Sequence, residues 1–359
     1  MTRRSRSPDR ELREGIAFAL LQGISPVVFR ECVERNGSAA AAFRANKDGP
    51  AKHEALQNAD AVIARSSELG IALLLQGEPG FPSDLLDLTD APRLLYALGS
   101  VSLLERRRVG IVGTRQSSGS GERITHQMAG RLVRSGAVVV SGMAFGIDAA
   151  AHRGALDAGG GTIAVLGGGV DLPYPPSHAL LHASIASDGL VLAEARIGTR
   201  PTKGAFPKRN RIIAALSETL IVIEAGDRSG ALITSRLALE LGRTVAALPG
   251  PIDSPRHVGT NRLLAEGASF IERIEDALSI AGIFESEAAP VEDAHADVSD
   301  DDPAQARILK AVRTGATDIE ELARSAGLSP RDLANTLAML ELTGHLVITD
   351  GATVSLASG

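Results

Sequence analysis

The sequence is poor in residues that would indicate a disulfide-bonded, zinc-binding or membrane protein. Its 359 residues include one cysteine, Cys32, and no tryptophan. One thiol cannot close an intrachain disulfide or supply the thiolates of a structural zinc site. No uncharged apolar run approaches the ~18 residues that span a bilayer. The basic N-terminus also lacks the apolar stretch of a secretory signal. We therefore expect a cytoplasmic protein without a membrane partner.

Positive charge is also scarce, because 37 Lys and Arg residues face 43 Asp and Glu residues, for a net charge of -6. This balance argues against a protein that coats polyanions indiscriminately. One segment has the opposite charge balance. Residues 195–217, here called the basic run, contain no carboxylate and six cations, which are Arg196, Arg200, Lys203, Lys208, Arg209 and Arg211.

Aromatic residues make up only 3% of the chain, yet Phe206 lies inside the basic run. Cations beside a stacking ring suit a single-stranded nucleic acid. The alternative is an ordinary solvated basic loop, which is the usual meaning of a charge run. The basic run therefore predicts a focused nucleic-acid site, and charge alone leaves the alternative open.

The chain divides into four segments by pattern. Residues 1–78 carry the apolar spacing of short helices, and residues 79–284 alternate between strand and helix patterns. Residues 285–302 are acidic, rich in Ala and free of Lys and Arg, which predicts a linker. Residues 303–359 have the pattern of a helix-turn-helix followed by a hairpin.

The central segment predicts a parallel sheet. Six short apolar runs are predicted strands, at 109–112, 138–141, 163–166, 190–193, 220–223 and 244–248. Their continuous hydrophobicity is typical of strands covered on both faces. Helical stretches lie between them, at 121–134, 147–158, 177–187, 210–217 and 230–241. The alternation indicates an α/β fold with a doubly wound parallel sheet.

Capping residues support the helices of both flanking segments. In the first segment, Ser25 and Pro26 are placed as the N-cap and first residue of a helix. In the last segment, Gly327 marks the turn, and Ser329 with Pro330 opens the third helix.

That third helix, at 329–343, would be the recognition helix of a winged helix. It carries one basic residue, Arg331, against Asp332 and Glu341. Helices that read a DNA groove are normally basic. We therefore expect a protein-contact or regulatory role for this segment, with weak duplex binding as the alternative.

Polar, glycine-rich segments follow five of the predicted strands. They are 113–119, 141–148, 167–171, the basic run and 224–230. In open α/β sheets ligands bind outside the carboxyl ends of the strands. Small residues there let backbone amides and helix N-termini approach an anion. Each loop alone could be a simple tight turn, but together with Arg115 they predict a phosphate-rich ligand. Neither G-x-G-x-x-G nor a Walker motif is present, so we expect no nucleotide cofactor.

Two histidine-containing pairs are the candidates for chemistry. Asp148 and His152 lie four residues apart on one helix and could exchange protons. We favour a structural role, in which Asp148 caps the first turn and His152 tethers a neighbouring loop. His178 and His182 also share a helix face, but no third ligand accompanies them. We expect an incidental surface pair, and therefore neither a catalytic nor a metal site.

The motifs, taken in order, resemble those of the DprA/Smf family (DNA-processing protein A). They are Val109–Arg115, Ser141–His152, Thr162–Pro175, Phe206–Ile213, Ser229–Thr234, Pro249–Gly250 and Gly259–Asn261. The resemblance implies an extended Rossmann-like domain between a small helical, sterile-alpha-motif-like domain and a winged helix. It implies binding of single-stranded DNA without a cofactor and protection of incoming DNA. It further implies loading of the RecA recombinase in natural transformation, and homodimerisation through the Rossmann domain.

The resemblance also assigns residues to the DNA-facing motifs. These are Arg115, Ser141, Gly142, Phe206, Arg209, Asn210 and Arg211, with Lys203 and Lys208 matched by position in the basic run. Asn210 is expected at the start of a helix, and the apolar stretch 263–271 is our expectation for the dimer seam.

The alternative function is a nucleotide-processing or nucleotide-sensing Rossmann protein, similar to phosphoribohydrolases. Those enzymes carry P-G-G-x-G-T-x-x-E. The corresponding string at 248–253 lacks the second glycine and the catalytic glutamate. We therefore expect a binding protein and not an enzyme.

Overall fold

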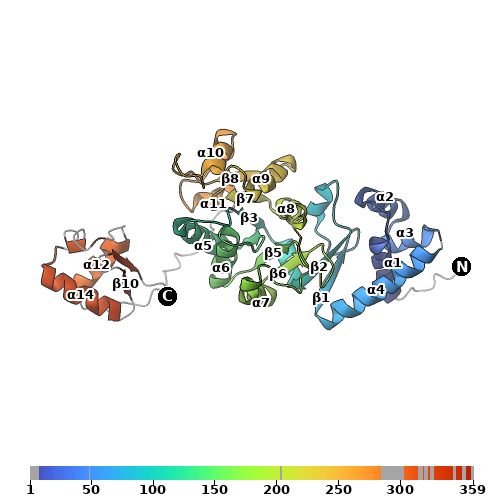
Figure 1. The fold of residues 1–359 in the computed structure, drawn as a ribbon, viewed down its shortest axis with the longest axis horizontal. Coiled ribbons are helices and arrows are strands. Elements are labelled where there is room, and N and C mark those ends of the chain that lie inside the picture. Colours follow the sequence, from blue (N-terminus) through green and yellow to red (C-terminus); the bar gives the residue numbers. More distant parts are fainter. Residues whose placement is uncertain are drawn as a thin grey trace. The chain divides into compact units, whose positions relative to one another are not determined.

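The computed structural model describes residues 8–47, 49–202, 204–283, 303–313, 318, 322–323, 327–342, 345–349 and 353–356. The chain forms two compact units, residues 1–285 and 286–359 (Figure 1). In the described part of the chain, no helix is both long and apolar enough to cross a membrane.

Four helices open the larger unit, α1 (Pro8–Leu20), α2 (Pro26–Asn36), α3 (Ala39–Ala45) and α4 (Pro50–Glu68). Ser25 caps α2 as predicted, since its hydroxyl accepts a hydrogen bond from the Val28 amide at 3.2 Å. Gly37 ends α2 with φ 82°, a left-handed conformation that favours glycine. Phe18 and Phe29 stack at 4.8 Å and join α1 to α2.

A nine-stranded sheet forms the centre of this unit, in the order β1-β2-β6-β5-β4-β3-β7-β8-β9. The strands are β1 (Ile71–Leu75), β2 (Leu94–Gly99), β3 (Arg108–Val112), β4 (Val138–Ser141), β5 (Thr162–Leu166), β6 (Leu190–Ala193), β7 (Thr219–Val222), β8 (Thr244–Ala247) and β9 (Ser269–Phe270). All six predicted strands are present, each within one residue of its predicted bounds. The doubly wound α/β fold is confirmed.

The sheet extends beyond the predicted strands at both edges. β9 pairs in parallel with β8, while β2 runs antiparallel to both β6 and β1. β1 lies inside the segment 1–78 that was expected to be helical, so that expectation is wrong for residues 71–75. Five continuous apolar residues fit a strand or a buried helix equally well. These residues form a strand because they pair with β2, from Ile71 opposite Leu98 to Leu75 opposite Leu94.

Helices cover both faces of the sheet. The elements between strands are η1 (Ser83–Asp87), η2 (Val101–Glu105), α5 (Gly119–Arg134), α6 (Ile147–Asp157), η3 (Pro176–His178), α7 (Ala179–Asp188), α8 (Ala205–Leu216), α9 (Gly230–Glu240), α10 (Val258–Ala265) and α11 (Asp276–Ile280). One core cluster joins α8 and α9 to the sheet, and another joins α5, α6 and α11 to it. In Figure 1 these two groups lie on opposite sides of the strands.

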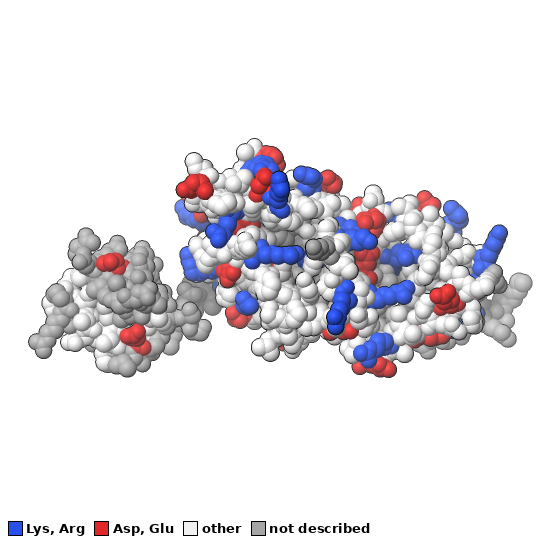
Figure 2. Space-filling model, in the orientation of Figure 1, with Lys and Arg blue, Asp and Glu red and all other residues white. Residues whose placement is uncertain are grey.

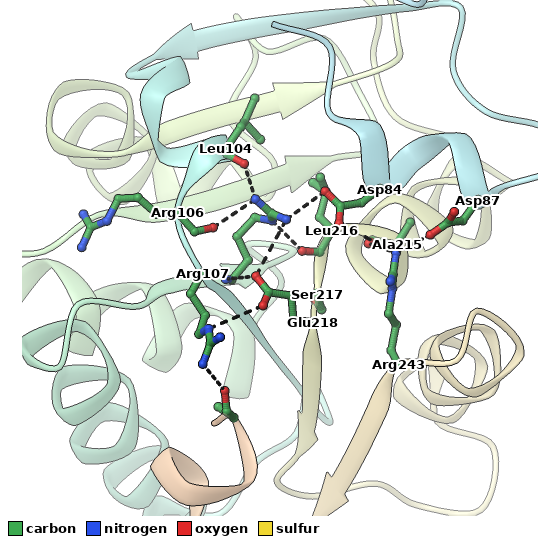
Figure 3. Close-up of polar contacts among 12 residues, drawn as sticks. Asp84, Asp87, Leu104, Arg106, Arg107, Ala215, Leu216, Ser217, Glu218 and Arg243 are labelled. Atoms are coloured by element: carbon green, nitrogen blue, oxygen red, sulfur yellow. Dashed lines mark hydrogen bonds and ion pairs between the residues drawn. The ribbon is translucent and has the colours of Figure 1, made fainter. Parts of the chain in front are cut away.

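A network of ion pairs closes the amino edge of the sheet (Figure 3). Arg108, the buried first residue of β3, donates to the Leu216 carbonyl oxygen at 2.8 Å and pairs with Asp84 at 2.8 Å. Arg243 pairs with Asp87 at 2.7 Å. These contacts join η1, the end of α8 and the starts of β3 and β8. They hold the amino ends of these strands together, at the edge of the sheet opposite the carboxyl ends.

The smaller unit contains α12 (Pro303–Arg313), α14 (Pro330–Leu342) and the antiparallel hairpin of β10 (Leu346–Thr349) and β11 (Thr353–Leu356). Gly327 adopts φ 62° at the predicted turn. The Ser329 hydroxyl accepts from the Asp332 amide at 3.2 Å, which caps α14. Buried apolar residues of both helices and the hairpin share one core, as expected for a helix-turn-helix with a wing.

Candidate nucleic-acid interface

A cavity of about 520 Å³ lies where the winding of the sheet reverses. From β3 the chain builds β4, β5 and β6 on one side and then returns to place β7 on the other. Loops on either side of such a reversal diverge and leave a crevice for a ligand. The lining comes from the loops after β3, β4 and β7 and from the first turns of α8 and α9. We call it the switch-point cavity.

The loop after β3 is held rigidly at the rim of this cavity. Glu224, buried at the end of β7, accepts hydrogen bonds from the Ser118 amide at 3.0 Å and the Ser118 hydroxyl at 2.5 Å. The Thr114 amide donates to the Glu224 carbonyl oxygen at 2.7 Å. The loop therefore has a fixed path, and Arg115 at its tip is exposed at the rim.

Arg115 and two aromatic rings form the exposed wall. The Arg115 guanidinium lies over the half-buried Phe206 ring, 4.9 Å from its centroid, which is cation–π geometry. Tyr174 lies beside Phe206, with ring centroids 5.6 Å apart. All three residues line a smaller cavity of about 70 Å³ that shares Arg115 and Phe206 with the first. The predicted pairing of a cation with a stacking ring is therefore present.

Arg209 is a structural element of the cavity wall. Its side chain is buried, and Nη1 donates to the carbonyl oxygens of Gly142 at 2.5 Å and Val165 at 2.6 Å. Burial lowers the pKa of Arg209, although the nearby carboxylate of Asp148 opposes the shift. A Cβ at position 142 would lie 1.9 Å from Nη1, so Gly142 is required by the position of Arg209.

The Asp148–His152 pair is buried, but Asp148 does not cap the first turn of α6 as expected, because the start of this helix has no side-chain cap hydrogen bond. Asp148 is buried and accepts from the Ala144 amide at 3.3 Å, and burial raises its pKa. His152 is fully buried, and its Nδ1 lies 2.8 Å from the Thr162 hydroxyl. Burial lowers the pKa of His152 to about 3. Its tether is a strand residue and not the expected loop.

The expectation of a surface pair at His178 and His182 is wrong. Both rings are buried, with His178 Nδ1 3.1 Å from the Met143 carbonyl oxygen and His182 Nε2 2.8 Å from that of Val170. Each imidazole thus satisfies a loop carbonyl. Among the described residues, no group of three or more His, Cys, Asp or Glu side chains is placed to hold a metal ion.

The basic run is a helix over half of its length. α8 begins at Ala205, so Asn210 lies in mid-helix and not at the predicted start. Pro207 is compatible with the helix because the amides of a first turn have no partner within the helix. Asn210 still lines the switch-point cavity, and Lys208 is exposed beside a neighbouring cavity of about 250 Å³.

Besides Lys208, two of the predicted DNA-facing side chains lie outside the switch-point cavity, and both are buried. The buried Ser141 hydroxyl donates to the Ile111 carbonyl oxygen at 2.7 Å. Arg211 is buried in ion pairs with Glu194 at 2.7 Å and Asp90 at 3.0 Å. Both side chains are therefore engaged in holding the fold. Lys203 lies outside the described residues.

Sequence reasoning predicted the loop and helix at 224–241 but did not single out Arg228 as a site residue. Arg228 is exposed at the rim of the switch-point cavity, and Ser229 caps the helix by accepting from the Ala231 amide at 3.3 Å. The N-terminus of α9 thus directs backbone amides and partial positive charge into the cavity. The signal was the glycine-rich loop 224–230, which the sequence marked as polar without showing that Arg228 would reach the rim.

Comparisons with known proteins find several similar chains. The model of a family described as DNA recombination-mediator protein A matches residues 72–282, and that of the DprA winged helix domain matches residues 292–352. The putative DNA processing protein DprA of Mycobacterium tuberculosis is 40% identical over 274 residues, which is 75% of this chain and 70% of the relative. Protein Smf of Escherichia coli is 36% identical over 280 residues, 77% of this chain and 75% of the relative.

Two solved structures are also similar. The X-ray structure of DNA processing protein A from Streptococcus pneumoniae superposes with a TM-score of 0.65 at 34% identity, covering 74% of this chain and 97% of that one. A Helicobacter pylori DNA processing protein A structure, which concerns that protein's single-stranded DNA binding mode, gives a TM-score of 0.54 at 32% identity. It covers 59% of this chain and 96% of that one.

Proposed function

The chain belongs to the DNA recombination-mediator protein A family, also called DprA/Smf, and we propose that it binds single-stranded DNA at the switch-point cavity. The observation that carries the proposal is the exposed Arg115 stacked on Phe206 at the rim of a cavity of about 520 Å³. The binding mode described for the H. pylori relative supports the same ligand.

The wall and rim of the cavity offer separate partners for phosphates and bases. Backbone phosphates contact Arg115, Arg228, Lys208 and the amides at the start of α9. One base stacks on Phe206 or Tyr174, and every base has a face that can stack, so binding tolerates most sequences. Arg209 is buried in the wall of the cavity and supports its loops, and it is not a primary phosphate contact.

Titration of a labelled oligo(dT) at several salt concentrations tests this assignment. Each lost phosphate contact should lower the slope of log affinity against log salt by about 0.7. Arg115→Ala should reduce both affinity and slope. Phe206→Ala should weaken binding by about 5- to 150-fold with little change in slope, because stacking contributes ~1–3 kcal/mol. Arg134→Ala, an exposed residue at the far end of α5, is the matched control. A salt-insensitive complex, or two variants that bind like the wild type, would refute the proposal.

We also propose that the protein protects incoming DNA and loads the RecA recombinase on the bound strand during natural transformation. The support is the family's description as a recombination mediator and the resemblance of its motifs. RecA's DNA-dependent ATP hydrolysis on strands covered by single-strand-binding protein should start sooner with this protein present. Arg115→Ala should lose part of the effect. An unchanged lag with the wild type would contradict loading.

We propose a homodimer formed through the Rossmann domain near β9. Leu263 and Ile271, in the stretch expected as the seam, are buried in the core and unavailable to a partner. Exposed apolar side chains nearby support the proposal, with Ile252 94% and Phe270 55% exposed. Phe270→Asp should produce monomers in light scattering. Leu180→Asp, on the exposed face of α7, should not. A Phe270→Asp dimer would refute this seam.

We propose that the protein acts by binding and not by catalysis. His152 is inaccessible, and the loop after β8 lacks the catalytic residues expected of a phosphoribohydrolase. Incubation with nucleoside monophosphates should release no free base. Its release would favour the nucleotide-processing alternative.

A further inference from the structure

We propose that a second site for the same strand lies at the far end of the carboxyl edge, where Arg93, Arg196 and Tyr96 hold a backbone phosphate. The site is a cavity of about 130 Å³, here called the junction cavity, lined by the end of α1, the start of β2 and the loop after β6. This inference rests on the proposed function, because it assigns the site to single-stranded DNA.

The topology places the junction cavity on the same edge of the sheet as the switch-point cavity. β2 is antiparallel to β6, and Tyr96 pairs with Ala193 at the carboxyl end of β6. Arg93, which precedes β2, therefore lies beside Arg196, which follows β6. The end of α1 at Leu20 completes the lining.

Tyr96 provides an unused donor. Its side chain is 1% exposed, and its hydroxyl has no hydrogen-bond partner among the described residues. A buried hydroxyl without a partner is costly, and a ligand that accepts a hydrogen bond would remove that cost. Tyr96 lines the junction cavity, so a ligand there would lie beside this side chain.

Two arginines converge on the same space. Arg93 Nη1 donates to the carbonyl oxygens of Leu21 and Ile24, each at 3.1 Å. These bonds fix the guanidinium through Nη1, and its other two nitrogens take no part in them. Burial lowers the pKa of Arg93, Glu194 opposes the shift, and the nearby charge of Arg196 adds to it. Two like charges at close range favour an anion between them.

The one carboxylate in the lining does not cancel this charge. Glu194 accepts a hydrogen bond from Arg211 Nη2 at 2.7 Å, and Arg211 also pairs with Asp90, so three arginines face two carboxylates around the junction cavity and one positive charge remains in excess. Two arginines and a phenol hydroxyl together offer several donors and a positive field. Phosphate is the anion that single-stranded DNA supplies at regular spacing.

A third cavity shares lining residues with both sites. The cavity of about 250 Å³ beside Lys208 and Arg200 shares Arg209 with the switch-point cavity and Glu194 with the junction cavity. Four inter-strand steps of ~4.8 Å, or ~19 Å, separate the β3–β7 gap from the β6–β2 gap. In Figure 2, Lys and Arg side chains lie across the middle of the larger unit. A strand a few nucleotides longer than the switch-point site needs would therefore reach the junction cavity.

A length series of labelled oligo(dT), from about 4 to about 16 nucleotides, tests the second site in the full chain. We compare the wild type with Arg196→Ala, Tyr96→Phe and the control Arg134→Ala. Both site variants should bind the shortest strands normally and bind long strands about 10-fold more weakly. Arg196→Ala should also lower the salt slope by about 0.7 on long strands alone. Tyr96→Phe should keep its urea midpoint, because the lost hydroxyl had no protein partner.

The outcomes separate the two proposals. Loss confined to long strands supports the junction site. Normal binding by both variants at every length would overturn it, and so would an equal loss at every length, which indicates an effect on the switch-point cavity or the fold. If the wild type bound no oligonucleotide, the proposed function would fail and this inference with it.

Discussion

Replacing Gly142 by alanine should destabilise the larger unit, although it adds only one methyl group. The new Cβ would lie 1.9 Å from Arg209 Nη1 and 2.3 Å from Cζ. Real carbon and nitrogen atoms do not approach so closely, so the guanidinium has to move. Because Arg209 is buried, the movement breaks its bonds to the carbonyl oxygens of Gly142 and Val165.

The magnitude follows from those two bonds. A hydrogen bond from a charged donor contributes about 1.5–3 kcal/mol, so losing both should lower the free energy of unfolding by about 3–6 kcal/mol. That is a large share of the ~5–15 kcal/mol typical of a folded domain. Binding of single-stranded DNA should fall as well, since Arg209 lines the switch-point cavity and both of the cavities beside it.

Urea unfolding of Gly142→Ala and three companion variants checks the reasoning. Gly119→Ala is the matched control, because a Cβ there meets nothing within 4 Å. It should change stability by less than about 0.5 kcal/mol. In Gly142→Ala/Arg209→Met the clash is removed, so the double variant should be no less stable than Arg209→Met alone. A Gly142→Ala midpoint equal to the wild type, or strictly additive losses in the double variant, would refute the argument.

Three further predictions concern other parts of the chain. The pKa of His152 is about 3 in the folded protein and 6.5 ordinarily. Between these pH values, His152 is therefore protonated in the unfolded chain and neutral in the folded protein. The free energy of unfolding should therefore fall by up to ~1.4 kcal/mol per unit as pH drops from 6.5 towards 3. His152→Gln should flatten this decline in urea midpoints; the raised pKa of Asp148 acts in the opposite sense in both proteins. Arg108→Met should cost about 3–5 kcal/mol in the same assay, since it leaves Asp84 and several carbonyls without their buried partner; a loss below ~1 kcal/mol would contradict that role. The isolated 303–359 fragment should show no micromolar binding of duplex DNA in a filter assay, and tight binding would overturn the protein-contact role proposed for the smaller unit.

Local pattern was sufficient to predict most of the central fold. The six parallel strands are buried on both faces, so their sequences are continuously apolar and easy to find. Capping residues such as Ser25 and Ser329 act within three residues of their own position and could likewise be predicted. β1 was missed because five apolar residues specify burial and not conformation. Its strand pairing with β2 is a tertiary contact that no local pattern reveals.

The candidate site was predictable where its side chains are exposed and not where they are buried. Arg115 and Phe206 lie together at the cavity, as the motifs predicted. Arg209 and Arg211 belong to the same basic run, yet each is buried against partners distant in the sequence. For Arg211 one of those partners is Asp90, which precedes it by more than a hundred residues. A charge pattern shows which residues are basic, but only the fold shows which of them are already paired.

Pairing also explains how an acidic protein can present a basic surface. At the amino edge of the sheet, Arg107 and Arg108 pair with Glu218 and Asp84 (Figure 3). At the carboxyl edge, within the described part of the chain, Arg115, Lys208 and Arg228 form no ion pair. The field that a polyanion meets is set by these unpaired charges, because paired ones cancel within a few ångströms. Neutralising Asp84 would therefore leave positive charge unpaired at the amino edge, away from the proposed DNA site, and would destabilise the sheet. Each unpaired cation at the carboxyl edge, by contrast, adds directly to the positive field of that site.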